Sequence, residues 1–335
     1  MRKLFQLFIL VLTCIFFSCE KVFFEEDGVS GDPFVNFDYL WNEVNEKYTF
    51  FDYKDIDWEQ SRQIYRQKIY TGMSSDSLFR VLAAMLNELE DGHVNLISSF
   101  NVSRYFIETL GRDNYDERIV NENYLNYDFY TTGPFRHSFL ENDQIGYVRF
   151  SSFTGTVTHN QLDFMLNRYR NTEGLIFDIR ENGGGSSGDI YRILAHFSEE
   201  PTLLFFSESK AGPDPNTFLP AQEVYSDPSP VFYLKPIVIL TDRSTYSSGS
   251  FLTLGAKQFA NVTVMGDTTG GGLGVPNGGQ LPNGWTYRFS VTRTLDVNGN
   301  NFENGVPPNI YVITTDEDRA AGIDTILEAA ILEIL

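Results

Sequence analysis

The sequence is poor in cysteine and in positive charge. Its 335 residues include only two cysteines, Cys14 and Cys19, so the rest of the chain has no disulfide, no thiol nucleophile and no cysteine metal site. The 25 lysines and arginines are outnumbered by 45 aspartates and glutamates, and the net charge of -20 argues against a nucleic-acid partner. Hydrophobic residues make up 42% of the chain, which is enough for a buried core and excludes a disordered protein.

The N-terminus has the pattern of an export signal. Arg2 and Lys3 precede an apolar run from residue 4 to 17, which is too short for a good membrane span. Ser18 and Cys19 follow, and the whole segment resembles a bacterial lipoprotein signal. The resemblance implies cleavage before Cys19, acylation of that cysteine and anchoring to a bacterial membrane in the cell envelope. The alternative is an ordinary signal peptide with an incidental cysteine. We assign residues 1–18 to the signal and 19–35 to a tether.

The body divides by its hydrophobic pattern. Residues 36–98 are expected to form an N-terminal helical subdomain with three helices, of which the third ends near Gly92 as its C-cap, before a strand at 94–97. Residues 99–142 are expected to form a connecting segment of short strands and loops. From residue 143 to 335, strands alternate with helices, which predicts a layered α/β core. Within that core we expect a hairpin over 285–297 and a C-terminal helix from Asp324.

A pair of serines lies where a predicted buried strand gives way to a helix. Ser247 and Ser248 follow the strand over 236–240, and the helix behind them offers unpaired N–H groups and a positive dipole end. Such groups stabilise an oxyanion, and an exposed serine there suits a nucleophile. Taken alone, however, the segment favours a simple helix cap, because serine is a preferred N-cap residue.

Three successive glycines, residues 183–185, follow another predicted strand and leave backbone N–H groups open to a carbonyl or an anion. The alternative is a plain tight turn. The segment lacks the lysine of a phosphate loop and the spacing of a dinucleotide fingerprint, and we expect neither a metal nor a cofactor. Of the four histidines, His93 follows a helix stop, and His196 is expected to be packed in a helix. The other two, His137 and His159, are expected in polar loops.

Together these segments resemble the tail-specific (C-terminal processing) and tricorn-core serine proteases. The motifs of that family occur here in order, over about residues 36 to 330: Asp91-Gly92-His93, the turn from Asp178 to Gly185, Thr245-Tyr246-Ser247, the loop from Gly266 to Gly274, and the segment from Glu303 to Asn309. The resemblance implies a crotonase-like α/β core with Ser247 as nucleophile. It also implies an oxyanion hole made by the N–H of Ser248 and of Gly184 or Gly185.

Two departures from the family pattern refine this expectation. Where one branch has a catalytic lysine, this chain has Gly272, and its last lysine is Lys257. His93 is therefore the expected base, as in the tricorn-like branch, with Glu303 matching the glutamate that orients it and Asp91 as the alternative. The stretch between His93 and Ile145 is also too short, at about fifty residues, for the PDZ domain that many relatives carry.

The sequence thus predicts a serine peptidase that acts on peptide bonds of exported proteins, including unfolded or C-terminal segments. The alternative is a non-catalytic surface lipoprotein that uses the same fold to bind a peptide or an apolar ligand. The separation of His93 and Ser247 distinguishes the two, because a base must lie within hydrogen-bonding reach of its nucleophile.

Overall fold

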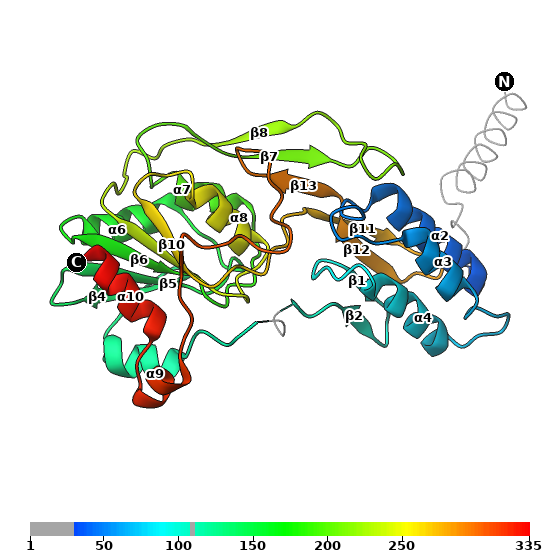
Figure 1. Cartoon of the computed structure of the whole chain (residues 1–335), viewed down its shortest axis with the longest axis horizontal. Coiled ribbons are helices and arrows are strands. Elements are labelled where there is room, and N and C mark those ends of the chain that lie inside the picture. The colour runs from blue at the N-terminus through cyan, green and yellow to red at the C-terminus, as the bar shows by residue number, and fades with distance from the viewer. Residues whose placement is uncertain (1–29, 108–110) are drawn as a thin grey trace, which may run out of the picture.

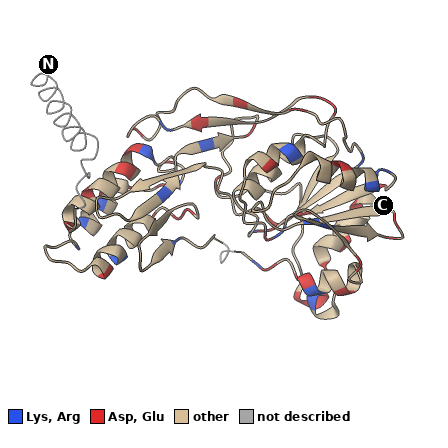
Figure 2. Cartoon of the chain, turned by 180° about the vertical axis from the view of Figure 1, so that it is seen from behind, with Lys and Arg blue, Asp and Glu red and all other residues tan. Residues whose placement is uncertain are grey.

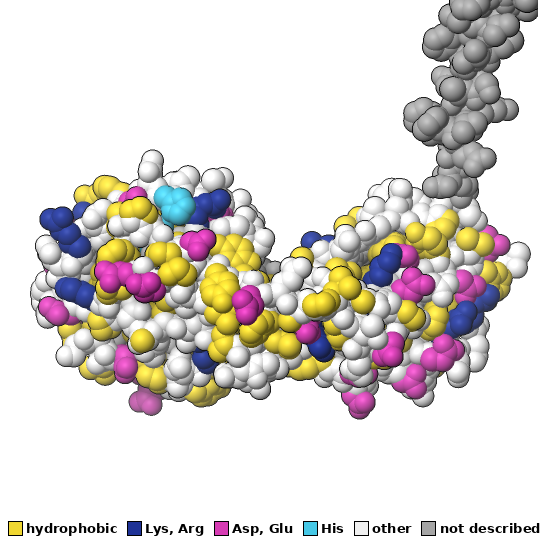
Figure 3. Space-filling view, turned by 90° about the horizontal axis from the view of Figure 1, so that it is seen from above, with side chains coloured by type: hydrophobic (Ala, Val, Ile, Leu, Met, Phe, Trp, Pro, Cys, Tyr) yellow, Lys and Arg dark blue, Asp and Glu magenta, His cyan; other side chains and the backbone are white. Residues whose placement is uncertain are grey.

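The computed structural model describes residues 30–107 and 111–335, which form two lobes joined by a narrower waist (Figures 1 and 3). The predicted signal at 1–18 and Cys19 lie outside the described residues. None of the helices within the described ranges has the length and apolar character needed to cross a bilayer.

The N-terminal lobe packs three helices on one face of a four-stranded antiparallel sheet. The helices are α2 (Pro33–Lys47), α3 (Trp58–Arg66) and α4 (Ser75–Asn87). The sheet runs in the order β11 (Pro276–Gln280), β12 (Thr286–Ser290), β1 (Asn95–Ile97) and β2 (Val102–Arg104). Helix α2 begins inside the predicted tether, because Asp32 accepts a hydrogen bond from the Phe34 N–H and Pro33 suits the first helical position.

Two expectations for this lobe were wrong. Helix α4 ends at Asn87, and the residue with positive φ is Glu90 (46°), so Gly92 is not a C-cap glycine. The lobe is also not purely helical or continuous in sequence, because β11 and β12 come from the segment assigned to the core. The large side chains Trp285, Tyr287 and Phe289 complete the hydrophobic cluster under the helices.

The larger lobe is built on a seven-stranded sheet, in which the five strands β5, β6, β9, β10 and β14 run parallel to one another. Its order is β14 (Ile310–Tyr311), β10 (Val262–Gly266), β9 (Ile237–Thr241), β6 (Gly174–Asp178), β5 (Ile145–Phe150), β4 (Phe135–Leu140) and β3 (Tyr130–Thr132). Strands β3 and β4 come from the predicted connecting segment. That segment also contains the short helix α5 (Glu117–Ile119) and a π-helical turn at Val120–Tyr124.

Helices cover both faces of this sheet (Figure 1). The helices α6 (His159–Tyr169), α7 (Gly188–Leu194) and α8 (Ser248–Ala256) contribute to one hydrophobic cluster, with alternate residues of the strands. The C-terminal helix α10 (Thr325–Ile334), which follows α9 (Asp316–Ala321), packs on the opposite face with the other strand residues. This alternation is what a parallel sheet with two covered faces requires.

A third sheet, of β7 (Thr202–Ser209), β8 (Gln222–Ser226) and β13 (Thr292–Leu295), extends from the core toward the N-terminal lobe (Figure 1). Strands β12 and β13 are adjacent in sequence but belong to different sheets, so the hairpin expected over 285–297 does not form. The chain crosses from one sheet to the next at Val291 instead.

Candidate active site

The turn that leads from β9 into α8 is organised by a buried aspartate. Asp242 Oδ1 accepts hydrogen bonds from the backbone N–H groups of Ser244 and Thr245 at 3.1 and 2.9 Å. The same oxygen accepts the N–H of Glu181 at 2.9 Å, which ties the serine turn to the glycine turn. One short acidic side chain thus fixes the relative position of both motifs.

Ser247 adopts a backbone conformation that is strained for a residue with a side chain. Its φ of 54° and ψ of -121° place it at the sharp junction between strand and helix. Although it occupies the N-cap position of α8, its side chain makes no capping hydrogen bond. Instead, Ser247 Oγ lies 2.9 Å from His93 Nε2. The capping interpretation therefore fails, and the hydroxyl faces a base.

His93 reaches Ser247 from the other lobe, on the loop between α4 and β1. Asp91 Oδ1 accepts the His93 backbone N–H at 2.8 Å, and Asp91 Oδ2 accepts the Ser290 hydroxyl at 2.9 Å. Asp91 thus fixes the loop rather than the ring. Burial lowers the pKa of His93 below its ordinary 6.5, Asp91 opposes this shift, and the charge of Arg288 adds to it. The ring is therefore neutral at neutral pH, as a general base must be.

The ring of Tyr246 fills the space beside Gly272, the residue that was matched to the lysine of one branch of the family. A Cβ on Gly272 would lie 2.3 Å from Tyr246 Cζ, and one on Gly92 would lie 2.9 Å from its hydroxyl oxygen. The Tyr246 ring centroid is 4.9 Å from that of His93, and its hydroxyl donates to Asp91 at 3.3 Å. A tyrosine in this place and a lysine at Gly272 exclude one another sterically.

Glu303 is buried, and no hydrogen bond joins it to the His93 ring among the described residues. Its Oε2 accepts the Leu273 N–H at 2.6 Å. Burial raises the pKa of Glu303 well above its ordinary value, and the charge of Asp91 raises it further. His93 Nδ1 has no hydrogen-bond partner among the described residues. The nearby Gly274 backbone nevertheless raises the pKa of the ring. That Glu303 orients His93 stays a prediction.

The glycine turn lies directly against the serine. A Cβ on Gly184 would be 2.8 Å from Ser247 Cβ and 2.9 Å from the Ser248 nitrogen. The Gly184 N–H donates to Asn182 Oδ1 at 3.0 Å, and the Ser248 hydroxyl donates to the Gly185 carbonyl at 2.8 Å. Because the Ser248 N–H lies in the first turn of α8, it has no partner inside the helix. Gly184 therefore packs directly against Ser247 and Ser248, and Gly185 lines the same cleft as the two serines.

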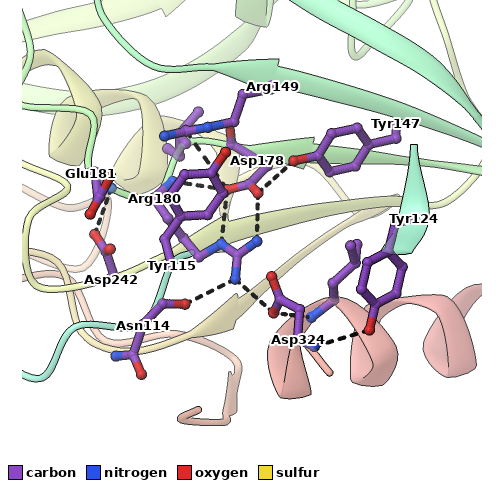
Figure 4. Close-up of polar contacts among 12 residues, drawn as sticks. Asn114, Tyr115, Tyr124, Tyr147, Arg149, Asp178, Arg180, Glu181, Asp242 and Asp324 are labelled. Carbon is purple, nitrogen blue, oxygen red and sulfur yellow. Dashed lines mark hydrogen bonds and ion pairs between the residues drawn. The ribbon is translucent and has the colours of Figure 1, made fainter. Parts of the chain in front are cut away.

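The acidic and basic residues ahead of the glycines form a buried network (Figure 4). Arg180 donates to Asp178 Oδ2 at 2.6 Å and to Asp324 Oδ1 at 2.9 Å, and all three side chains are buried. Tyr147 also donates to Asp178 at 2.9 Å. This network anchors the N-terminus of α10 beneath the turn, so Asp178 and Arg180 support the site without facing it.

The serine and the histidine open into a cleft of about 420 Å³ between the lobes. The core contributes Ile190, Tyr191 and Phe251, and the N-terminal lobe contributes Arg104 and Arg288. No group of three His, Cys, Asp or Glu side chains in residues 30–107 and 111–335 is arranged to hold a metal. The cleft can thus accommodate an extended chain beside a serine and a neutral imidazole.

The remaining histidines lie elsewhere. His196 is buried, as expected, with its Nε2 3.1 Å from Asp163 Oδ1. The loop expected for His137 was wrong, because it lies in β4, fully buried, with Nδ1 2.7 Å from the Tyr169 hydroxyl. Its alternation with Phe135 and Phe139 was too weak to reveal the strand.

Sequence reasoning missed three residues around the site: Asp242, Tyr246 and Arg288. Asp242 had a recognisable signal, since an aspartate ahead of Ser and Thr favours a turn of this kind. Tyr246 and Arg288 carry no local signal, because their contacts come from segments distant in sequence.

Known proteins resemble the chain along most of its length. The sequence model of peptidase family S41 matches residues 144–312, and that of the tricorn protease C1 domain matches residues 33–87. A candidate peptidase from Parabacteroides merdae, known from a crystal structure, is 40% identical with a TM-score of 0.87, covering 91% of this chain and 98% of its own. Mature CPAF superposes with a TM-score of 0.67 at 14% identity, over 91% of this chain and 97% of its own, a likeness of fold alone.

Two curated relatives share a smaller part. The carboxy-terminal processing proteases CtpB and CtpA of Bacillus subtilis are 24% and 23% identical over 53% and 56% of this chain. The matches span only 36% and 39% of those proteins, little more than a third of their length. Because the S41 model matches half of the chain and the Parabacteroides protein matches it almost end to end, the chain belongs to peptidase family S41.

Proposed function

We propose that this chain is an active serine peptidase that hydrolyses peptide bonds of exported proteins, including their unfolded or C-terminal segments, by a Ser–His mechanism. The observation that carries the proposal is the 2.9 Å separation between Ser247 Oγ and His93 Nε2 at the base of an open cleft. This separation supports catalysis over the binding-only alternative, because a binding protein has no need of a strained serine aimed at a neutral imidazole.

In the proposed mechanism, neutral His93 accepts the Ser247 proton through Nε2 while Oγ attacks the peptide carbonyl. The negative charge that develops on the carbonyl oxygen is stabilised by the Ser248 N–H, at the positive end of α8, and by the glycine turn. Gly185 is the better second donor, because the Gly184 N–H already donates to Asn182. Protonated His93 then gives its proton to the leaving amine. In the second half of the reaction His93 takes a proton from water, which attacks the acyl group, and then returns that proton to the departing Ser247 Oγ.

Glu303 acts, in this proposal, through the backbone rather than through the ring. Its carboxyl group holds the Leu273 N–H, and the next residue, Gly274, lies beside His93. Burial and the charge of Asp91 raise the pKa of Glu303 well above its ordinary value, which favours the protonated form of Glu303. Glu303 is then a positioning residue for the loop that confines the imidazole.

The proposal extends to fold and location. The β/α layering around Ser247 is consistent with a crotonase-like core over 143–335, and the export pattern at the N-terminus supports acylation at Cys19 and attachment to the cell envelope. The Bacillus relatives are named for carboxy-terminal processing, which supports, by similarity, a role on C-terminal segments.

A serine-reactive fluorophosphonate tests the nucleophile. Wild-type protein is expected to be labelled, and Ser247→Ala to lose labelling completely, because the attacking oxygen is gone. Ser248→Ala is the matched control, since the proposal uses its N–H and not its hydroxyl, and it should retain most of the labelling. Persistent labelling of the Ser247→Ala protein would refute the assignment, as would its loss only in Ser248→Ala.

A further inference from the structure

The cleft is basic in a protein that is otherwise acidic. The chain carries 45 acidic and 25 basic residues, and acidic positions are scattered over both lobes (Figure 2). Among the residues that line the cleft beside Ser247, however, Arg104 and Arg288 are the charged ones, and none is acidic. This local reversal of charge sign needs a reason, because positive charge beside a catalytic imidazole works against its protonation.

Strand register places the two arginines on one face of the N-terminal sheet. Arg288 in β12 pairs with Asn95 in β1, and Asn95 pairs with Arg104 in β2, so the three residues form a row across the strands. The neighbours Tyr287 and Phe289 point to the opposite face, into the cluster under the helices. Because side chains alternate along a strand, Arg288 and Arg104 face away from those helices, and both line the cleft.

Arg288 is the more informative of the two. Its side chain is exposed, and no carboxylate of the described residues forms an ion pair with it. By contrast, Arg293 of β13, the next strand along the chain, forms an ion pair with Glu208 at 2.5 Å. Arg104 packs its guanidinium over Phe106, 4.4 Å from the ring centroid.

The opposite wall of the cleft is apolar. Ile190 and Tyr191 of α7 and Phe251 of α8 line it from the core. A bound segment therefore meets hydrophobic side chains on the core side of Ser247 and guanidinium groups on the side of the N-terminal lobe. This polarity favours a ligand that carries an apolar group and a negative charge on opposite sides of the reacting bond.

We propose that the cleft binds a carboxylate of the substrate through Arg288. The inference rests on the proposed peptidase function and names the chemistry of its substrate. A guanidinium suits this task because its planar donors match both oxygens of a carboxylate. The carboxylate comes from an acidic side chain or from the terminal carboxyl group of the substrate chain.

Peptide retention on the full-length Ser247→Ala protein tests the proposal without requiring catalysis. Four pools of decapeptides with randomised neutral residues are used: Glu or Gln at one internal position, each with a free or an amidated C-terminus. Mass spectrometry of the retained peptides is expected to favour carboxylate-bearing pools about tenfold, the value of a charge-assisted hydrogen bond. Preference for Glu over Gln in amidated pools identifies a side chain. Preference for free over amidated termini in Gln pools identifies a terminus.

Further substitutions in the Ser247→Ala background provide the controls. Arg288→Gln should abolish the preference, and Arg288→Lys should retain part of it. Arg80→Gln, at an exposed arginine of α4 that pairs with Asp76, should leave it unchanged. Equal or absent retention of all pools overturns the proposal, as does an undiminished preference in Arg288→Gln or its loss in Arg80→Gln. If the Ser247→Ala protein prefers the carboxylate pools but the wild type cleaves none of the pools, the peptidase proposal is refuted and the carboxylate site is supported.

Discussion

The imidazole of His93 is only 5% exposed, and its surroundings oppose its protonation. Burial contributes most to this effect, Arg288 adds to it, and Asp91 together with the Gly274 backbone offsets part of it. A buried base of this kind remains neutral, and so able to accept a proton, at pH values where a free histidine is already charged.

The pH dependence of the reaction should therefore have its acidic limb below pH 6.5. Protonation of His93 removes the base, so the rate falls as the pH drops through the lowered pKa and stays constant above the ordinary value. The rate constant of fluorophosphonate labelling between pH 4.5 and 8 measures this limb. Arg288→Gln should move it upward, because it removes a charge that lowers the pKa. A midpoint at or above 6.5 in the wild type would contradict the expectation.

The glycine at the lysine position gives a second prediction at the residue scale. Gly272 has a φ of 74°, and a Cβ added to it would lie 2.3 Å from the Tyr246 ring. Gly299 has a similar φ of 84°, but a Cβ added there would meet open space. Gly299→Ala should lower the free energy of unfolding by about 1 kcal/mol through backbone strain. Gly272→Ala should cost roughly 1–3 kcal/mol more, because the ring must move. Urea denaturation measures both, and equal losses would show that Tyr246 does not occupy the site tightly.

At the scale of elements, the site depends on how α10 is attached to the glycine turn. Burial alone would raise the pKa of Asp178, but the charges of Arg180 and Arg149 outweigh it and hold the pKa below its ordinary value. The charge of Asp178 is therefore retained inside the protein, and Arg180 connects it to the N-cap residue of α10, Asp324. The turn and the helix are stabilised as one unit.

Arg180→Met should thus be strongly destabilising. The substitution removes the cation that pairs with Asp324 and leaves Asp178 with only the more distant Arg149, at 3.9 Å. Removing one partner of a buried pair costs about 3–5 kcal/mol. Thermal unfolding followed by circular dichroism measures the loss. Arg80→Met on the surface of α4 is the control and should stay within about 0.5 kcal/mol of the wild type. A loss of similar size in both variants would contradict a special role for the buried network.

The elements also show which parts of the structure sequence patterns can predict. Helices α2 to α4 and strands β5, β6 and β9 have clear periodicity or continuous apolar runs, and they form where expected. The pairing of β1 with β12 joins residues about 190 positions apart, for instance Asn95 with Arg288, and no local pattern carries that information. The motifs identified Ser247 and His93, but Tyr246 and Arg288 acquire their neighbours only through the tertiary fold. For the same reason, no local pattern indicated that Glu303 would accept a hydrogen bond from the Leu273 backbone.

At the scale of the whole molecule, the proposed location of the protein depends on its N-terminal segment. In the proposed lipoprotein, Cys19 carries the acyl chains, so wild-type cells should incorporate labelled palmitate into the protein and retain it in the membrane fraction. Cys19→Ser should lose the label and leave that fraction, whereas Cys14→Ser should behave as the wild type. Palmitate incorporation that persists in Cys19→Ser would contradict the anchor.

The interleaving of the two lobes has a consequence for how the chain acquires activity. The base lies near residue 93, the nucleophile at residue 247, and the strands that complete the sheet beneath the base lie at residues 276–290. A ribosome delivers these parts in that order, so the N-terminal lobe lacks half of its sheet until most of the polypeptide has been made. The newly synthesised chain therefore has no assembled pair of His93 and Ser247 until its last third is available. In the proposed peptidase, hydrolysis can begin only after the last third has folded back onto the first, so completion of folding would be the event that switches the activity on.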